Sequence, residues 1–407
     1  MKTLNCVDLT QHEVEALQHE FNFANAFTQQ SQSPSQMDIV NRLPELWLEA
    51  ERSKQQDLNN KFIESFYTTR GLKSALKPNN IMLHYSASIA IMHIANYLFK
   101  KRLSVTLIEP CFDSLFGVLK NFNIPINPLE EELLYDGDTI YKNLKNSIKT
   151  DAIFLVDPNN PTGFTTLGTQ NKKIFQEIIR YCKDYNKLLI IDYCFANFLM
   201  YDPNIELYDT YQLLKESGIK YMAIEDTGKC WPIQSTKAAM LKVSDCLYQD
   251  MYEIYTSYIL SVSPFILNLL SEYILDSHRN YFGHIRNLLR ENRAILQENL
   301  QGQILHLPDT MAKTSVAWCE IKDDSIKATD LQKFIFKEKG VYVLPGTFFF
   351  WNNPTLGEKY IRIALARDTD NFMQGMILLK EGLELLKPQN WVLKTENLPI
   401  NPAILAL

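Results

Sequence analysis

Three groups of polar residues that could do chemistry each follow a run of apolar residues typical of a β-strand. The string Asp-Pro-Asn-Asn-Pro-Thr-Gly occupies positions 157–163, Asp192 follows Leu-Leu-Ile-Ile, and Lys229 ends the string Ile-Glu-Asp-Thr-Gly-Lys. Each alone has a simple structural interpretation: a rigid turn, a helix-capping aspartate and a surface lysine. Together they favour a site, because a lysine amine can bond covalently to a carbonyl group and a buried carboxylate needs a cationic partner.

The pair Asp192 and Lys229 predicts chemistry on a bound ring. A protonated pyridine nitrogen is a suitable partner for a buried aspartate, and the aspartate keeps such a ring an effective electron sink. Lys237, which follows Lys229 in the chain, is a second cation suited to a phosphate group.

The elements that must position these residues alternate along the chain. Strand-like runs at 81–85, 105–108, 152–156, 188–191 and 221–224 are separated by helical segments such as 88–100, 113–121 and 173–185. Repeated strand, helix, strand order predicts a mostly parallel sheet with helices on both faces. Ligands on such sheets bind beyond the carboxyl ends of the strands, which is where all three groups fall.

Other segments flank this sheet. Residues 1–36 are polar, and the amphipathic pattern through Glu13, Leu17 and Phe21 predicts a short helix in them. The apolar spacing over 37–66 predicts helical structure. A long helical stretch, about 243–301, precedes strands near 316–321, 341–344 and 360–364 that predict a second, smaller α/β domain. We therefore divide the chain into an arm (1–36), a large domain (37–285), a small C-terminal domain (286–388) and a tail (389–407).

The composition is that of an ordinary globular protein and argues against several classes. The 407 residues are 46% hydrophobic and 22% charged, with a net charge of −6 and no long run of Lys or Arg, so we expect no nucleic-acid partner. No apolar stretch is long enough to span a membrane and no signal-peptide pattern is present, so we expect no membrane association and a cytoplasmic location. The seven cysteines and seven histidines lack the spacing of metal ligands, and we expect no metal.

The order of the polar groups resembles that of the fold type I, class I and II aminotransferases over nearly the whole chain. The shared pattern is Asn-Pro-Thr-Gly, then Asp192, then Lys229, then Lys237. The resemblance implies pyridoxal phosphate as cofactor and an α/β fold like that of aspartate aminotransferase. Such a fold has a mostly parallel seven-stranded sheet in the large domain, a smaller C-terminal α/β domain and an N-terminal helical arm.

The same resemblance assigns roles to individual residues. Lys229 would carry the cofactor as a Schiff base, Asp192 would bind its pyridine nitrogen and Asn160 its phenolic oxygen. Arg362 would bind the substrate α-carboxylate, and Asn160 would also be a substrate-binding residue. The other implied cofactor contacts are Ser86, Ala87, Ser88 and Lys237 at the phosphate, Phe112 stacked on the ring, and Phe195. Two of these depart from the family pattern: Phe195 replaces a common tyrosine, which removes one donor to the phenolic oxygen, and Lys237 replaces a common arginine.

A closer resemblance covers residues 9 to about 367. The strings Leu-Thr-Gln at 9–11, Ile-Glu-Asp-Thr-Gly-Lys at 224–229, Trp-Pro at 231–232 and Val-Ser-Pro at 262–264 are similar to those of the pyridoxal-phosphate- and dioxygen-dependent L-arginine oxidases and hydroxylases. This implies that the arm is a lid over bound arginine, with Thr10 and Glu13 at the guanidinium and Thr10 among the catalytic residues. Asp226 would also pair with the guanidinium, and its alternative role is to stabilise the cofactor loop.

The expected activity is oxidation of L-arginine by dioxygen to 4,5-didehydro-2-oxoarginine and 2-ketoarginine, with hydrogen peroxide and ammonia. Hydroxylating members carry an Asp and a His on the arm where this chain has Asn25 and Phe27, so no base on the arm would activate water at carbon 4. The alternatives are an L-arginine 4-hydroxylase giving 4-hydroxy-2-ketoarginine, an aminotransferase, a cyclase of hydroxyarginine, and a catalytically inactive relative with a regulatory role. The resemblance also implies a homodimer.

Overall fold

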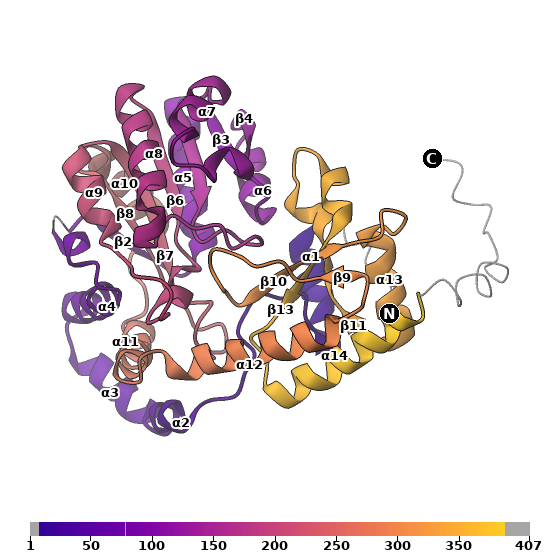
Figure 1. The fold of residues 1–407 in the computed structure, drawn as a ribbon. Helices are drawn as coiled ribbons and strands as arrows, with labels where there is room; N and C mark the ends of the chain where they lie inside the picture. Colours follow the sequence, from indigo (N-terminus) through magenta and orange to yellow (C-terminus); the bar gives the residue numbers. More distant parts are fainter. Residues whose placement is uncertain (1–7, 78, 387–407) are drawn as a thin grey trace.

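The computed structural model describes residues 8–77 and 79–386. These residues form a large sheet with helices around it, a smaller antiparallel sheet, and an N-terminal arm that crosses from one to the other (Figure 1). None of the helices in these two ranges is long and apolar enough to cross a membrane. The tail predicted at 389–407 and the first seven residues of the arm lie outside the described residues.

Seven strands form the large sheet in the order β2, β8, β7, β6, β5, β3, β4. Their bounds are β2 Ile81–His84, β3 Val105–Glu109, β4 Ile126–Glu130, β5 Ala152–Val156, β6 Leu188–Asp192, β7 Lys220–Asp226 and β8 Ala239–Val243. Neighbours from β4 to β7 pair in parallel, whereas β8 is antiparallel to both of its neighbours. The predicted mostly parallel sheet is confirmed, but β4 and β8 were not among the predicted strands.

Helices cover both faces of this sheet, which is why every residue of β3, β5, β6 and β8 is buried. These helices are α5 Ala87–Lys101, α6 Ser114–Asn121, α7 Ile140–Ser147, α8 Lys172–Asp184, α9 Thr210–Ser217 and α10 Asp245–Tyr258. Short 3-10 helices are η1 Lys73–Leu76, η2 Glu131–Leu134, η3 Thr169–Asn171, η4 Ala196–Leu199, η5 Gly346–Phe349 and η6 Pro354–Lys359.

The helical structure predicted over 37–66 is confirmed, but it is divided into three helices. They are α2 Pro34–Asn41, α3 Leu43–Arg52 and α4 Gln55–Thr69. Pro44 lies in the first turn of α3, where its missing N–H costs nothing, and it therefore starts a new helix instead of continuing the previous one. α11 Pro264–Arg279 packs on α3 and α4.

The small sheet has the order β12, β13, β10, β9, with every neighbouring pair antiparallel. Its strands are β9 Leu305–His306, β10 Val316–Ile321, β12 Leu344–Pro345 and β13 Tyr360–Ala364, accompanied by α13 Ala328–Lys339 and α14 Thr369–Glu384. α12 Gly283–Leu300 runs from the large sheet's side to α14 across the lower part of Figure 1. The predicted domain boundary between 285 and 286 falls within α12 and stays a prediction.

The arm is built into the small sheet's side of the molecule. It comprises α1 Leu9–Ala16 and β1 Phe21–Asn22, and β1 pairs in parallel with β11 Val341–Tyr342. Phe21, expected in the arm helix, is thus in a strand, and the strand predicted at 341–344 is divided between β11 and β12. The next residue, Phe23, is fully buried against Phe372, so this part of the arm belongs to the core.

Candidate active site

Asp192 is the last residue of β6 and is fully buried. Its Oδ1 accepts the backbone N–H of Cys194 at 2.8 Å, whereas Oδ2 is buried without a hydrogen-bond partner among the described residues. Burial raises the pKa of Asp192, and the nearby charge of Lys229 opposes this rise. A buried carboxylate oxygen without a donor is costly, so Oδ2 marks a place where a ligand donor belongs.

Two lysine amines lie against one aromatic ring. Lys229 follows β7 and Lys237 precedes β8, and their Nζ atoms lie 4.0 and 4.5 Å from the centre of the Phe27 ring, which comes from the arm. Glycine at 228 permits this packing, because a Cβ there would lie 2.8 Å from Cδ of Lys237. Burial lowers the pKa of Lys237, with the charge of Lys229 acting in the same direction. The pair therefore suits a ligand that bonds to one amine and brings negative charge to the other.

The loop before Lys229 is fastened to the start of helix α5. The N–H of Ala87 donates to Oδ2 of Asp226 at 3.3 Å, and the N–H of Gly228 donates to Oδ1 of Asp226 at 2.5 Å. Because both carboxylate oxygens accept hydrogen bonds from backbone N–H groups, the geometry supports the loop-stabilising role of Asp226. Its contact with a substrate guanidinium stays a prediction.

The start of α5 is also the expected phosphate end of the site. Ser86 caps this 15-residue helix, its hydroxyl accepting the N–H of Ile89 at 3.4 Å, and Ala87 and Ser88 follow in the first turn. The positive end of the helix dipole makes such a terminus attractive to an anion.

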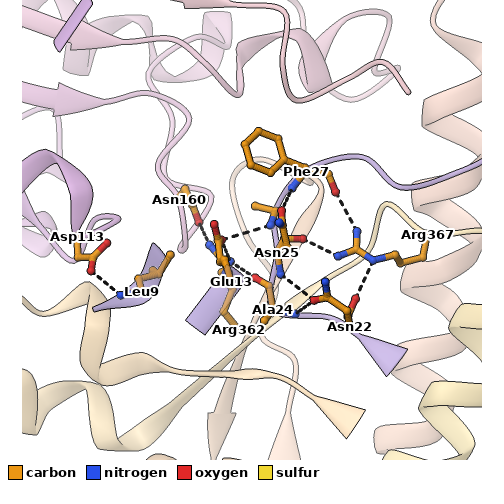
Figure 2. A network of polar contacts seen from close by, with 11 residues as sticks. Leu9, Glu13, Asn22, Ala24, Asn25, Phe27, Asp113, Asn160, Arg362 and Arg367 are labelled. Carbon is orange, nitrogen blue, oxygen red and sulfur yellow. Dashed lines mark hydrogen bonds and ion pairs between the residues drawn. The ribbon is translucent and has the colours of Figure 1, made fainter. Parts of the chain in front are cut away.

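Arg362 comes from β13 of the small sheet and is fully buried. Its Nη1 donates to Oδ1 of Asn160 at 3.3 Å and its Nη2 to Oε1 of Glu13 at 2.7 Å, while Nη2 also contacts the carbonyl of Ala24 (Figure 2). Burial lowers the pKa of Arg362, and the carboxylate of Glu13 opposes this. The arm thus supplies the carboxylate that neutralises Arg362.

The predicted groups meet at one edge of the large sheet. Asn160 follows β5, Asp192 ends β6 and Lys229 follows β7, and these three strands are parallel neighbours. Arg362 reaches Asn160 from the small sheet. The amine of Lys229, the buried carboxylate of Asp192 and the guanidinium of Arg362 therefore lie at one edge of the sheet.

Comparison with known proteins agrees with this arrangement. The model of the family described as aminotransferase class I and II matches residues 54–376, which include Asn160, Asp192, Lys229 and Arg362. The chain belongs to this family.

This aminotransferase-family protein is also similar to individual proteins whose structure or activity is known. It is similar to a structure of MppP soaked with the product 2-ketoarginine, with 27% identity and a TM-score of 0.79 over 89% of this chain and 99% of that one. It is also similar to a double mutant of the Thermus thermophilus aspartate aminotransferase, at 14% identity and a TM-score of 0.73 over 94% and 98% of the two chains, which bears on the fold alone. A histidinol-phosphate aminotransferase of Thermococcus kodakarensis is 24% identical over 178 residues. This match covers 44% of this chain and 45% of that relative, which is less than half of either. The predicted fold type I architecture is confirmed.

Pyridoxal phosphate is the cofactor of the aminotransferase family, and the residues present fit it. The open Oδ2 of Asp192 can accept the N–H of the pyridine ring, and the amine of Lys229 can bond to the aldehyde carbon. Lys237 and the start of α5 would hold the phosphate. Asn160, beside Arg362, would hold the phenolic oxygen.

Two aromatic residues predicted at the cofactor lie in loops that follow strands. Phe112 is half-buried after β3, where the N–H of Cys111 donates to the carbonyl of Phe349 at 3.0 Å. Phe195 is buried and packs edge-on against Phe198, with ring centres 5.5 Å apart. Their contacts with the cofactor stay predictions.

Asp113 is a site residue that the sequence analysis missed. Its Oδ2 accepts the N–H of Leu9 at 2.7 Å, which docks α1 onto the large domain, and its Oδ1 is buried without a partner among the described residues (Figure 2). Burial raises the pKa of Asp113 to about 6, with Asp8 and Glu13 acting in the same direction. Its place directly after Phe112, in a loop following a strand, is a signal that could have found it.

The two arm residues predicted at a guanidinium have different surroundings. Glu13 does meet a guanidinium, but it is that of Arg362. Thr10 is exposed on α1, one residue from buried Leu9. The substrate contacts of both residues and the catalytic role of Thr10 stay predictions.

Proposed function

We propose that the protein is a pyridoxal-phosphate- and dioxygen-dependent L-arginine oxidase that forms 4,5-didehydro-2-oxoarginine and 2-ketoarginine, with hydrogen peroxide and ammonia. The likeness to MppP, whose structure was solved with 2-ketoarginine, supports the substrate class. The observation that carries the proposal is the buried ion pair between Arg362 and Glu13, at 2.7 Å.

This ion pair can exchange partners with a substrate that bears both charges. An α-carboxylate that binds Arg362 displaces Glu13, and the freed carboxylate of Glu13 then needs a cation in a half-buried place. Asp113, whose Oδ1 has no partner among the described residues, adds a second carboxylate nearby. Arginine satisfies both needs, since its carboxylate replaces Glu13 and its guanidinium pairs with the acidic groups.

The chain's own residues then perform the remaining tasks. When bound, pyridoxal phosphate supplies an electron sink for the electrons of the substrate α-carbon. In this proposal the amine of Lys229 takes the α-proton, and Asp192 would hold a proton at the ring nitrogen. Phe27, lying over both lysine amines, keeps bulk water from them.

The surroundings of Asn25 favour the oxidase over the 4-hydroxylase. Its Oδ1 accepts the N–H of Phe27 at 2.7 Å, so this side chain is engaged in a turn of the arm. Phe27 has no group that can accept a proton. Neither residue can therefore activate a water molecule at carbon 4.

Oxygen consumption with L-arginine alone tests the proposal. We expect dioxygen uptake and hydrogen peroxide formation without any keto-acid acceptor, and the two keto acids as products by mass spectrometry. Amino transfer to a keto acid without oxygen uptake would instead identify an aminotransferase, which the family match alone also accommodates. A main product that carries an oxygen from labelled water at carbon 4 would identify a hydroxylase. The homodimer belongs to the same proposal and is testable by sedimentation velocity.

The pH dependence of arginine binding is expected to report on Asp113. Its pKa is raised to about 6, and a nearby guanidinium would favour the ionised form. Binding is then linked to loss of a proton, so affinity is complete above about pH 6 and is lost as the pH falls through that value. The KM for L-arginine should rise between pH 7 and 5. In the variant Asp113→Asn, which keeps an acceptor for Leu9, KM should be roughly tenfold higher at pH 8 and flat over this range.

L-Citrulline is the matched control, because it has nearly the shape of arginine without the charge. Its binding to the unmodified protein should not change over the same pH range. A rise in the arginine KM that persists unchanged in Asp113→Asn would show that another group is responsible.

A further inference from the structure

Arg367 is a buried cation that none of the proposed roles uses. It follows β13, is 3% exposed, and forms no ion pair with a described acidic residue. Its guanidinium donates instead to four backbone carbonyls: Nε to Asn22 at 2.8 Å, Nη2 to Asn25 at 2.6 Å, and Nη1 to Phe27 and to Ala366, each at 2.9 Å. Three of these four carbonyls belong to one short turn of the arm, residues 22–27 (Figure 2).

The turn 22–27 has little regular structure of its own. Oδ1 of Asn22 accepts the N–H groups of Ala24 and Asn25 at 3.1 and 3.2 Å, and Oδ1 of Asn25 accepts that of Phe27 at 2.7 Å. These bonds satisfy N–H groups, whereas the carbonyls of residues 22, 25 and 27 converge on Arg367. Without the guanidinium, three buried carbonyls would lose their donor, which is a strong reason for the turn to change shape.

The same turn contacts two parts of the active site, the guanidinium of Arg362 and the two lysine amines. The carbonyl of Ala24 contacts the guanidinium of Arg362, and the ring of Phe27 lies over the amines of Lys229 and Lys237. Arg367 forms no hydrogen bond with any of these four side chains among the described residues. Its hydrogen bonds therefore influence the site through the shape of the turn.

We propose that Arg367 is a positioning residue that fixes the turn 22–27 so that Phe27 covers the Lys229 amine. The proposal rests on the role assigned to Lys229 and holds whichever amino acid is the substrate. A lysine cannot replace Arg367, because one ammonium group cannot reach carbonyls that approach the planar guanidinium from several directions.

Hydrogen exchange of the folded protein tests the first half of the proposal. In the variant Arg367→Lys we expect backbone amides of the peptide covering 22–27 to exchange about tenfold faster or more, since bonds worth about 1.4 kcal/mol or more are lost. Arg293→Lys is the matched control. Arg293 is likewise buried and donates from Nη2 to the carbonyls of Thr314 and Val316 at 3.2 and 3.1 Å, so its replacement should leave the 22–27 peptide unchanged.

Absorbance of the holoenzyme against pH tests the second half. Phe27→Ala uncovers the amine that binds the cofactor, and we expect it to shift the titration midpoint of the cofactor band. Arg367→Lys should shift the midpoint in the same direction, and the double variant should shift it no further, because both changes act through one ring. If Arg367→Lys does not fold, Asn25→Ala, which removes the acceptor of the Phe27 N–H within the turn, is expected to give the same shift.

Two results would overturn the proposal: an unchanged exchange rate at 22–27 in Arg367→Lys, or a midpoint shift that adds to that of Phe27→Ala. Neither readout requires arginine turnover. Absence of oxidase activity would therefore leave this inference standing while removing the proposed function.

Discussion

Replacing Lys229 with alanine is expected to lower turnover by roughly 10⁴-fold or more and to abolish covalent attachment of pyridoxal phosphate. The amine of Lys229 lies over the Phe27 ring, close enough to Asp192 to influence its pKa. We assign two tasks to this amine, covalent bonding of the cofactor and acceptance of the substrate α-proton. Alanine can perform neither, so the loss should exceed that of a residue with a single role.

Lys237 provides the matched control, because its amine lies against the same ring. Lys237→Gln removes a phosphate partner and should weaken cofactor affinity, while covalent attachment at 229 persists. After borohydride reduction and digestion, the cofactor mass is expected on the peptide that contains Lys229 in the unmodified protein and in Lys237→Gln. Finding the cofactor mass on Lys237 in the unmodified protein, or finding covalently attached cofactor after reduction of Lys229→Ala, would refute the assignment.

Some residues of the site could be predicted from the sequence because a neighbouring strand determines where they lie. Asn160, Asp192 and Lys229 directly follow apolar strands, and parallel neighbouring strands end at one edge of a sheet. Once the strands are identified, the meeting of these side chains follows from topology. Arg362 required the family resemblance, because the small sheet that carries it reaches the site only through tertiary packing.

The residues that were missed depend on contacts between distant parts of the chain. Asp113 is defined by its bond to Leu9, and Arg367 by its bonds to the turn 22–27. Neither contact leaves a periodic signal in the sequence. The structure adds what spacing could not show: the arm's own carboxylate, that of Glu13, occupies Arg362.

The two strands of the large sheet that were not predicted have patterns unlike that of a half-buried strand. β4 reads Ile-Asn-Pro-Leu-Glu, and only Leu129 in it is buried, as is common for an edge strand that tolerates proline. β8 includes a lysine, Lys242, that is buried within the strand. Its charge interrupts the apolar run, and the helical stretch predicted from about 243 begins only where β8 ends.

Asp192→Asn is expected to lower turnover by roughly 10³-fold while stabilising the protein that lacks cofactor. Burial raises the pKa of Asp192, so the folded apoprotein binds its proton more tightly than the unfolded chain does. The free energy of unfolding therefore falls as the pH rises above the ordinary aspartate range. Asparagine removes this penalty, and the melting temperature of the apoprotein should be higher in the variant at pH 8, with the difference vanishing at low pH. Such a trade of stability for activity is typical of a catalytic group.

Asp157→Asn is the matched control for Asp192→Asn. It shows which effects come from losing any buried aspartate, and which come from losing the carboxylate at the cofactor ring. Asp157 is also buried, directly after β5, but both of its carboxylate oxygens accept hydrogen bonds. Oδ1 accepts the hydroxyl of Thr165 at 2.6 Å, and Oδ2 accepts the N–H of Thr166 at 3.2 Å. Asparagine there should destabilise the protein with and without cofactor and leave the absorbance band unchanged. In Asp192→Asn the ring nitrogen loses the carboxylate that keeps it protonated, so the band should shift and α-proton removal should slow. Turnover within tenfold of the unmodified protein, with an unshifted band, would mean that Oδ2 of Asp192 does not meet the ring.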